Sequence, residues 1–335
     1  MNTQPTSTFE LTHDQYHKLV CDYRTVVAET EHIGRYFYEK LFLEHVESAA
    51  QDAPSTERNS LFGFELSLRD YIKVLSRPGA RVWKVFFGYN DGTTKFIRDG
   101  KETTVSKGFK LILQGLDIEG KINMTPPILL LTSIYRQPTE FTNCNGAHTE
   151  NLRIDVAGLA SAFSGHQHFL GGAGFDHTSG EHVPSLLRQN WMCAWRNLML
   201  EQSVPRRILT IEYGYNQGTG TPHNEPLRGY NFNFMTFIRA LTPRSDRSFE
   251  TGENFELDSK IRFLLVNETL EVEQAEASIE RNEQRRHDGI IGIMIAAFAY
   301  PDTPFYDTPT SYTFNFSAPC PPTCVGDLDD ECPEI

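Results

Sequence analysis

The sequence of 335 residues lacks a long apolar segment, and it has fewer basic than acidic residues. Its longest apolar run, residues 289–300 (GIIGIMIAAFAY), is shorter than the ~18 residues of a transmembrane helix, so we expect no membrane insertion. The amino-terminal residues show no basic segment followed by an apolar one, so we expect no secretory signal and a cytoplasmic location by default. The formal net charge of −13 argues against nucleic acid as a partner, because phosphates require a basic surface.

Intact catalytic motifs are also absent from the sequence. No Gly-x-Ser-x-Gly segment indicates a nucleophilic serine, and no His-Glu-x-x-His pair indicates a zinc protease. Residues 171–174 (GGAG) lack both the Lys-Ser/Thr pair of a phosphate-binding P-loop and the GxGxxG spacing of a dinucleotide-binding turn, so we interpret them as a flexible turn. The sequence therefore favours a protein that is not an enzyme, although it neither supports nor excludes acid–base catalysis.

One six-residue phrase occurs almost identically twice. Residues 88–93 read GYNDGT and residues 214–219 read GYNQGT, each after an apolar, β-rich segment. The Asn-x-Gly of each phrase is typical of a tight turn, because Asn and Gly tolerate positive φ. A helix is expected before each phrase, at residues 68–75 and at about 185–200, and a second strand after it. We interpret the phrases as an internal duplication, with a chance similarity between two hairpins as the alternative.

The expected elements indicate the fold class. We expect an α+β fold of two tandem pseudo-repeated units, each with helices packed on a small, mainly antiparallel sheet. The two units would span residues 1–137 and 151–318, with a joint at 138–150. A tail rich in Cys, Pro and acidic residues would follow at 319–335.

Several single elements can be predicted from local patterns. Residues 12–15 (THDQ) have the spacing of a capping box, and apolar residues then recur on one helical face, so we predict a helix over residues 13–29. A second helix is expected over residues 38–47. Buried strands are expected over residues 128–134 and 289–300.

Histidines and carboxylates are concentrated in one Gly-rich segment. On a strand, His166 and His168 would face the same side, with His177 nearby and Asp176 or Glu181 as an oxygen ligand. Two imidazoles beside a carboxylate are typical ligands of zinc or iron. The segment is therefore a candidate site for a divalent metal, and the alternative is an exposed loop without such a role.

The cysteines allow several interpretations. Cys320 and Cys324 flank Pro-Pro-Thr, and Cys332 follows in the tail. These thiols could hold a metal with one ligand from elsewhere, Cys320 and Cys324 could form a small disulfide, or the tail could pack its thiols against the protein. We expect Cys193 to be a small buried hydrophobe within a helix, whereas the position of Cys144 is uninformative. Six cysteines in a chain of this length do not indicate a secreted disulfide scaffold.

Three segments resemble a loose set of uncharacterised bacterial proteins of the kind found in Bacteroidota. They are LSLRDYIKVLSRPGARVWKVFFGYNDG, the strand that ends LILQGLDIEG, and the closing CPPTC. The resemblance covers roughly residues 10–120 and the tail, and it implies no activity, cofactor or catalytic residue. The long second half, with its second GYNxGT phrase, departs from that pattern.

Two functional hypotheses follow from these observations. The first is a non-enzymatic structural or interaction protein that associates with itself or with another protein. Tyr89, Asn90, Tyr215 and Asn216 would then lie at the contact with the partner, on two similar surfaces. The alternative is a metal-binding protein or metal-dependent enzyme that holds a divalent metal in the His-rich loop at residues 166–182.

Overall fold

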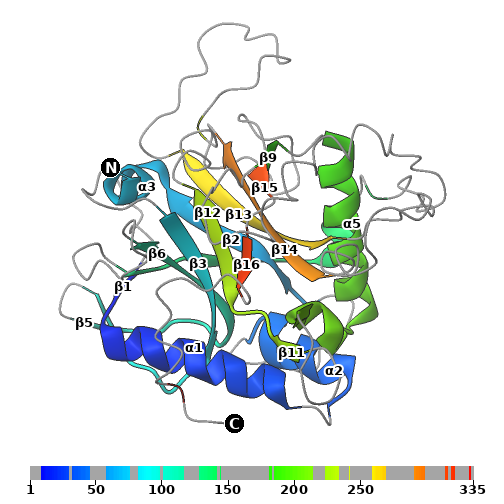
Figure 1. Ribbon diagram of the computed structural model, residues 1–335, viewed down its shortest axis with the longest axis horizontal. Coiled ribbons are helices and arrows are strands. Elements are labelled where there is room, and N and C mark those ends of the chain that lie inside the picture. The colour runs from blue at the N-terminus through cyan, green and yellow to red at the C-terminus, as the bar shows by residue number, and fades with distance from the viewer. Residues whose placement is uncertain are drawn as a thin grey trace, which may run out of the picture.

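The computed structural model of the chain describes two six-stranded antiparallel sheets with helices against them (Figure 1). The structure describes residues 9–29, 32–45, 58–75, 82–98, 101–116, 128–141, 144, 181–182, 185–213, 223–233, 241, 259–268, 290–298, 314–315, 318–320 and 332.

The first sheet is built around two long strands. β3 (Val82–Asn90) pairs along its whole length with β6 (Gly108–Leu116), and β12 (Gly229–Asn233) lies on the other side of β3. The strand order is β1-β7-β6-β3-β12-β16, and all neighbouring strands are antiparallel. The other strands are β1 (Phe9–Leu11), β7 (Ile128–Leu130) and β16 (Ala318–Cys320).

The second sheet has β13 (Lys260–Glu268) near its centre. This strand pairs with β2 (Ser60–Ser67) on one side and with β14 (Ile290–Phe298) on the other. The strand order is β8-β2-β13-β14-β15-β9. The other strands are β8 (Thr132–Arg136), β15 (Phe314–Asn315) and β9 (Glu181–His182). The chain leaves the first sheet after β7 and enters the second at β8, so Leu131 lies at the junction of the two sheets.

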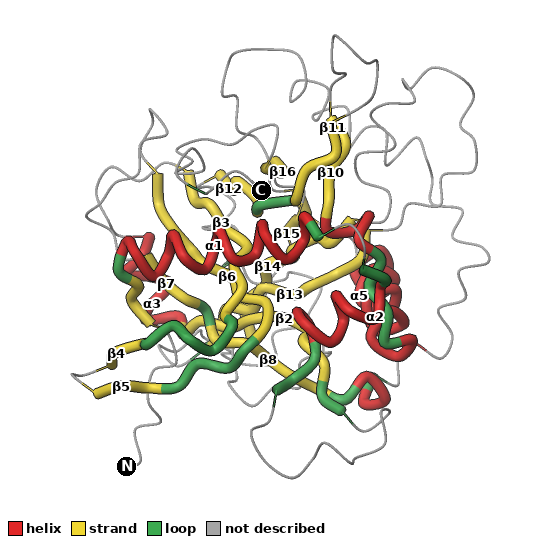
Figure 2. Tube along the Cα trace, turned by 90° about the horizontal axis from the view of Figure 1, so that it is seen from below, coloured by secondary structure: helices red, strands yellow, loops and turns green. Residues whose placement is uncertain are grey.

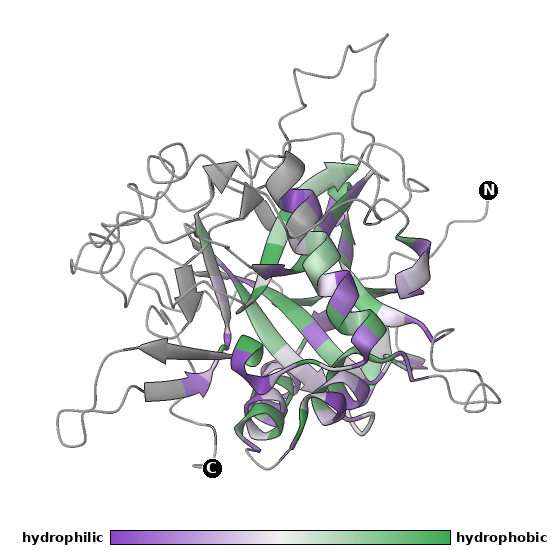
Figure 3. Cartoon of the chain, turned by 90° about the vertical axis from the view of Figure 1, so that its right-hand side faces the viewer, coloured by the Kyte–Doolittle hydropathy of each residue, from purple (hydrophilic) through white to green (hydrophobic). Residues whose placement is uncertain are grey.

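Two long helices pack against the sheets. α1 (His13–Ala28) lies across β3, and α5 (Ser185–Glu201) packs on β13 (Figures 1 and 2). The strands behind α5 are predominantly apolar (Figure 3). Thr12 caps α1, because its hydroxyl accepts a hydrogen bond from the N–H of Gln15 while the Gln15 side chain accepts one from the N–H of Thr12. No helix in the described part of the chain is long and apolar enough to cross a membrane.

Short elements connect these parts. The hydroxyl of Ser67 accepts a hydrogen bond from the N–H of Asp70 at 3.1 Å and so caps α3 (Leu68–Leu75). Four short helical segments follow α1 or flank α5 among the described residues, and two hairpins stand apart from the large sheets. They are α2 (Gly34–Phe37) with the π-helix η1 (Tyr38–Phe42), the 3₁₀ helices η4 (Pro138–Glu140) and η7 (Arg206–Leu209), the pair β4 (Phe96–Arg98) and β5 (Lys101–Thr103), and the pair β10 (Thr210–Tyr213) and β11 (His223–Pro226).

One large core connects the two sheets. Several of its aromatic rings meet edge-on, for example Phe87 and Phe109 with centroids 5.0 Å apart, and burying each such side chain stabilises the fold by roughly 1.5–3 kcal/mol. Two polar groups of the core donate hydrogen bonds to backbone carbonyls. The Trp195 indole N–H donates to the carbonyl of Leu61 at 3.0 Å, and the Tyr230 hydroxyl donates to the carbonyl of Ile291 at 2.6 Å, which joins the first sheet to the second.

The expected α+β class is confirmed, whereas the tandem pseudo-repeat is not. Both large sheets combine strands from residues 1–137 with strands from residues 151–318, and the pairings of β3 with β12 and of β2 with β13 join the two halves. The strands before the two phrases also differ in setting, since β3 is central in a large sheet and β10 belongs to a separate hairpin. The boundary at residues 138–150 stays a prediction.

Local predictions differ from the structure where a long-range contact competes with the local pattern. The helix expected over residues 38–47 ends at Phe42, because Leu43 forms a β-bridge with Ser60. The strand expected over residues 128–134 is divided at Leu131, where the chain changes sheet. The buried strand expected within residues 289–300 is confirmed as β14.

Candidate functional site

One face of α1 carries three residues of the types that bind metals. His13, His17 and Cys21 follow one another at four-residue spacing, so they lie on the same face of the helix. The rings of His13 and His17 are stacked, with their centroids 6.4 Å apart. The face that α1 buries against the sheet is a different one, formed by Tyr16, Leu19, Val20, Tyr23, Val26 and Val27.

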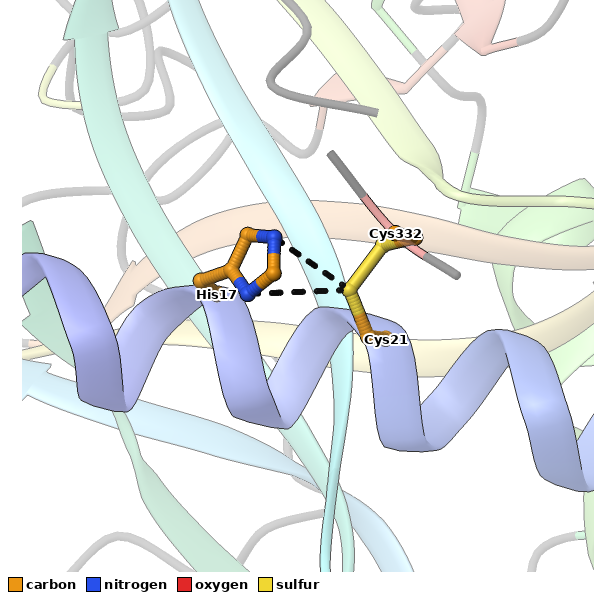
Figure 4. Close-up of side chains that lie close together, drawn as sticks. All are labelled: His17, Cys21 and Cys332. Atoms are coloured by element: carbon orange, nitrogen blue, oxygen red, sulfur yellow. Dashed lines mark hydrogen bonds between the residues drawn. A yellow bond between two sulfur atoms is a disulfide. The ribbon is translucent and has the colours of Figure 1, made fainter. Parts of the chain in front are cut away.

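A residue of the carboxyl-terminal tail completes this group. Cys332 forms a disulfide with Cys21, although 311 residues separate them in the sequence, and their Cα atoms are 5.6 Å apart. Figure 4 shows the bond between the two sulfurs, with the His17 ring one helical turn before Cys21. The disulfide therefore holds Cys332 against α1.

The His17 ring lies close to the disulfide. Its Nδ1 and Nε2 atoms are 3.9 and 3.7 Å from the Sγ of Cys21, and whichever nitrogen carries the proton can donate a hydrogen bond to the sulfur. The ligand atoms of His17, Cys21 and Cys332 all lie within 4.8 Å of one another, and all three residues are half-buried. The group, called the α1 cluster below, is therefore both compact and accessible.

The α1 cluster has two chemical states. As a disulfide, its sulfurs are not thiolates and are poor metal ligands. A thiol reductant that supplies two electrons and two protons converts the disulfide into two thiols. Two thiolates with an imidazole are a donor set of zinc sites, in which Zn–S and Zn–N distances of ~2.3 and ~2.0 Å place neighbouring ligand atoms about 3.5–4 Å apart.

Ion pairs beside the cluster connect α1 to the first GYNDGT turn. Lys18 pairs with Asp22 on α1 and, at 3.3 Å, with Asp91. Burial by itself would lower the pKa of Lys18, but the hydrogen bonds and charges of Asp22 and Asp91 raise it overall. Burial opposes the shift at Asp91 too, where hydrogen bonds from Thr93 and Lys18 lower the pKa. The pairs help to fix the rotation of α1 over β3, although such exposed pairs contribute at most about 1 kcal/mol each.

Comparison with protein-family models, with curated proteins and with solved structures finds no match. The chemistry of the α1 cluster is therefore inferred from its own side chains.

The His-rich segment expected to bind metal lies almost entirely outside the described residues. His166, His168, Asp176 and His177 are not described. Glu181 begins β9 at the edge of the second sheet, where it pairs with Asn315. A metal site in this segment stays a prediction.

The turn residues expected at a partner contact are only partly described. Tyr89 and Asn90 are buried, with exposed fractions of 6% and 0%. The Asn90 amide donates to the carbonyl oxygens of residues 105–106, at 3.0 and 3.1 Å. Both side chains thus contact their own chain and leave little area for a partner. Tyr215 and Asn216 lie outside the described residues.

The helix cysteine has a role that the sequence did not reveal. Cys193 is buried in α5, as expected, but it also forms a disulfide with Cys144, 49 residues earlier. It is therefore not simply a small hydrophobe. The pairing links α5 to the segment after η4, and no spacing in the sequence predicts it.

Two of the three tail cysteines are described, and a small disulfide between Cys320 and Cys324 stays a prediction. Cys332 pairs with Cys21 of α1, whereas Cys320 ends β16 and Cys324 lies outside the described residues. The sequence suggested that the tail thiols could share a metal with one ligand from elsewhere in the chain. Cys21 and His17 are candidates for that ligand, and no pattern considered in the sequence pointed to them. The signal that could have found them is the His-x₃-His-x₃-Cys spacing on a helix that was correctly predicted.

Proposed function

We propose that this is a metal-binding protein whose site is the α1 cluster and whose binding is controlled by the Cys21–Cys332 disulfide. The observation that carries the proposal is the convergence of three ligands of zinc type within 4.8 Å. Zn²⁺ suits the donor set best, because thiolate and imidazole are its usual ligands. His13, one turn before His17, or a water molecule would take the fourth position.

The disulfide and the metal exclude each other, because both need the same two sulfur atoms. Reduction yields two thiols, and Zn²⁺ binding then displaces their protons. Oxidation of the two thiolates back to the disulfide removes two ligands and releases the ion. Two disulfides also favour an oxidising compartment over the cytoplasm expected from the sequence. In such a compartment the site would be closed until a reductant opens it.

Calorimetric titration of the full chain with Zn²⁺, with and without a phosphine reductant, tests the proposal. We expect binding only after reduction. His17→Ala and Cys21→Ser should each weaken it by at least about tenfold, because each removes a direct ligand. The Cys144→Ser/Cys193→Ser double variant is the matched control, since it removes the other disulfide and leaves the α1 cluster intact.

The same titration separates the α1 cluster from the two sites expected from the sequence. Cys324→Ser tests the tail thiols, and the His166→Ala/His168→Ala double variant tests the His-rich loop. If either of these changes abolishes Zn²⁺ binding while Cys21→Ser leaves it intact, the assignment to the α1 cluster is wrong.

We propose as a second function that the protein associates with itself or with another protein. This proposal rests on the sequence, as does the proposed internal duplication. Two large apolar side chains, Ile33 and Ile72, have exposed fractions of 74% and 42% and are accessible to a partner. If the GYN turns form the contact, Tyr89→Ala or Tyr215→Ala should reduce the particle mass measured by sedimentation. An unchanged mass for both variants would contradict a contact at the turns.

A further inference from the structure

A second group of reactive side chains lies near the junction of the two sheets. Lys110 of β6 is fully buried, and its Nζ donates hydrogen bonds to the Oγ of Ser106 at 3.0 Å and to the Oγ of Ser133, on β8, at 3.2 Å. A third, longer hydrogen bond of 3.5 Å goes to the carbonyl of Lys107. Ser106 and Ser133 are each half-buried, whereas Lys110 is fully buried.

The electrostatic setting of Lys110 favours the neutral amine. All three oxygens that accept its hydrogen bonds are uncharged. Burial lowers the pKa of Lys110 to about 7, because an ammonium loses its hydration there without gaining a counterion. At neutral pH a large fraction of the chains therefore has a free lone pair on Nζ next to two hydroxyls.

The backbone before β6 is shaped to bring Ser106 and Lys110 together. Four residues of extended strand span about 13 Å, so the chain must bend between them. Gly108 provides the bend with a φ of +101°, and a Cβ there would lie 2.9 Å from the carbonyl oxygen of Leu41 in η1. The Asn90 amide holds the carbonyls of residues 105–106. The first GYN phrase thus supports the loop that carries Ser106.

Tyr135 is a further positioning residue. Its hydroxyl donates to the carbonyl of Lys107 at 3.3 Å. Burial raises the pKa of Tyr135 to about 12, against the opposing effect of hydrogen bonds with Ser106 and Ser133. The phenol therefore stays protonated at neutral pH and remains a donor that fixes this loop.

We propose that Ser106 is a nucleophile for acyl transfer, that Lys110 is its general base, and that the substrate is a carboxylic ester. A serine hydroxyl within hydrogen-bond distance of a neutral amine is the arrangement that a Ser–Lys pair uses in place of Ser–His. Ser133 holds the amine from its other side. This activity is independent of the α1 cluster and its metal.

The reaction balances with water as the only co-reactant. Lys110 Nζ takes the proton of Ser106 Oγ as Oγ bonds to the ester carbonyl carbon. The carbon–oxygen bond to the leaving group then breaks, and the departing oxygen takes the proton from Nζ and leaves as an alcohol. Water, losing a proton to the same amine, attacks the acyl-serine. The bond to Oγ breaks, Oγ regains the proton, and a carboxylic acid is released.

An alkyl fluorophosphonate probe tests the proposal on the full chain, with the labelled peptide identified by mass spectrometry. We expect the label on Ser106. Ser106→Ala should abolish labelling, and Lys110→Met should slow it by about 100-fold or more. Thr104→Ala is the matched control, because Thr104 is an exposed hydroxyl in the same loop and should not affect labelling.

The pH profile separates a general base from a structural lysine. The labelling rate should rise with pH through about 7 as Lys110 loses its proton. The charged and titratable groups around it are Lys107, His45, Glu44 and Tyr135, and the pKa of His45 is itself lowered, chiefly by burial. The inflection should therefore persist in His45→Ala.

Labelling of the unmodified protein is sufficient to test the proposal, so the test does not depend on whether the variants fold. An unlabelled Ser106 in the parent, or a label on Ser133 or Lys110 instead, would show that Ser106 is not the nucleophile. A labelling rate that does not change between pH 6 and pH 8 would show that Lys110 is not its base. Hydrolysis of p-nitrophenyl acetate, with Ser106→Ala as the comparison, should follow the same pattern.

Discussion

Lys110 brings an amine into the protein interior among neutral oxygens, and this has a consequence for stability. Its pKa is about 7 in the folded chain, below the usual lysine value of 10.5. Between these two pH values the unfolded chain binds a proton that the folded chain does not, so the free energy of unfolding rises with pH over this window. Burial of the Lys110 side chain lowers the free energy of unfolding fully below about pH 7, and this destabilisation disappears as the pH approaches 10.5.

Lys110→Met removes this titration and should abolish its contribution to the pH dependence. Relative to the parent, we expect the variant to gain about 2–3 kcal/mol in the free energy of unfolding when the pH falls from 9 to 6. Urea unfolding at the two pH values measures the difference, and Lys107→Met, at an exposed neighbouring lysine, is the control. Parallel pH dependences for the parent and Lys110→Met would show that Lys110 is not buried as an amine.

Residues of this kind are hard to find in a sequence. Lys110 lies in the segment FKLILQGL, whose apolar pattern predicts a strand correctly, but nothing local shows that its amine meets Ser106 and Ser133. The positive φ of Gly108 bends the chain so that the Lys110 amine comes within hydrogen-bond distance of Ser106. A glycine before a strand is too common a feature to indicate it.

Single elements were predictable where short-range interactions decide them. The capping box at residues 12–15 identifies the start of α1, because both of its hydrogen bonds lie within one turn. The apolar, β-branched run of β14 identifies a buried strand. The helix expected over residues 38–47 was wrong at residues 43–45, because the bridge between Leu43 and Ser60 depends on a strand elsewhere in the chain.

The Cys144–Cys193 disulfide leads to a prediction about α5. Replacing both residues by Ser should lower the free energy of unfolding by about 2–4 kcal/mol, because the open chain gains conformational freedom when it unfolds. Urea unfolding without reductant measures this loss. The Cys21→Ser/Cys332→Ser double variant should lose about 1.6 kcal/mol more, since loop entropy grows with the logarithm of loop length. Unchanged unfolding midpoints in both double variants would contradict these two linkages.

At the scale of the whole molecule, the sequence indicates the class of fold but not its connectivity. Helices with antiparallel strands were expected, and both large sheets are antiparallel. Two separate units were expected as well, because the GYN phrases recur at a distance that suggests two domains. The pairing of β3 with β12 and of β2 with β13 depends on side chains far apart in sequence, and no local pattern encodes it.

The candidate metal site shows the same limit. One hypothesis from the sequence is that the tail thiols hold a metal together with one ligand from elsewhere in the chain. The sequence could not identify that ligand, because Cys332 reaches Cys21 only through the path of the whole chain. His17 and Cys21 then share one face because of the helical period alone.

The most direct test of the metal-binding proposal is the zinc content of the full chain, determined by elemental analysis after unbound metal has been removed. We predict near-stoichiometric zinc in the reduced parent, and none in the oxidised parent or in reduced Cys21→Ser. Zinc retained by reduced Cys21→Ser, or absent from the reduced parent, would contradict a metal site at His17, Cys21 and Cys332.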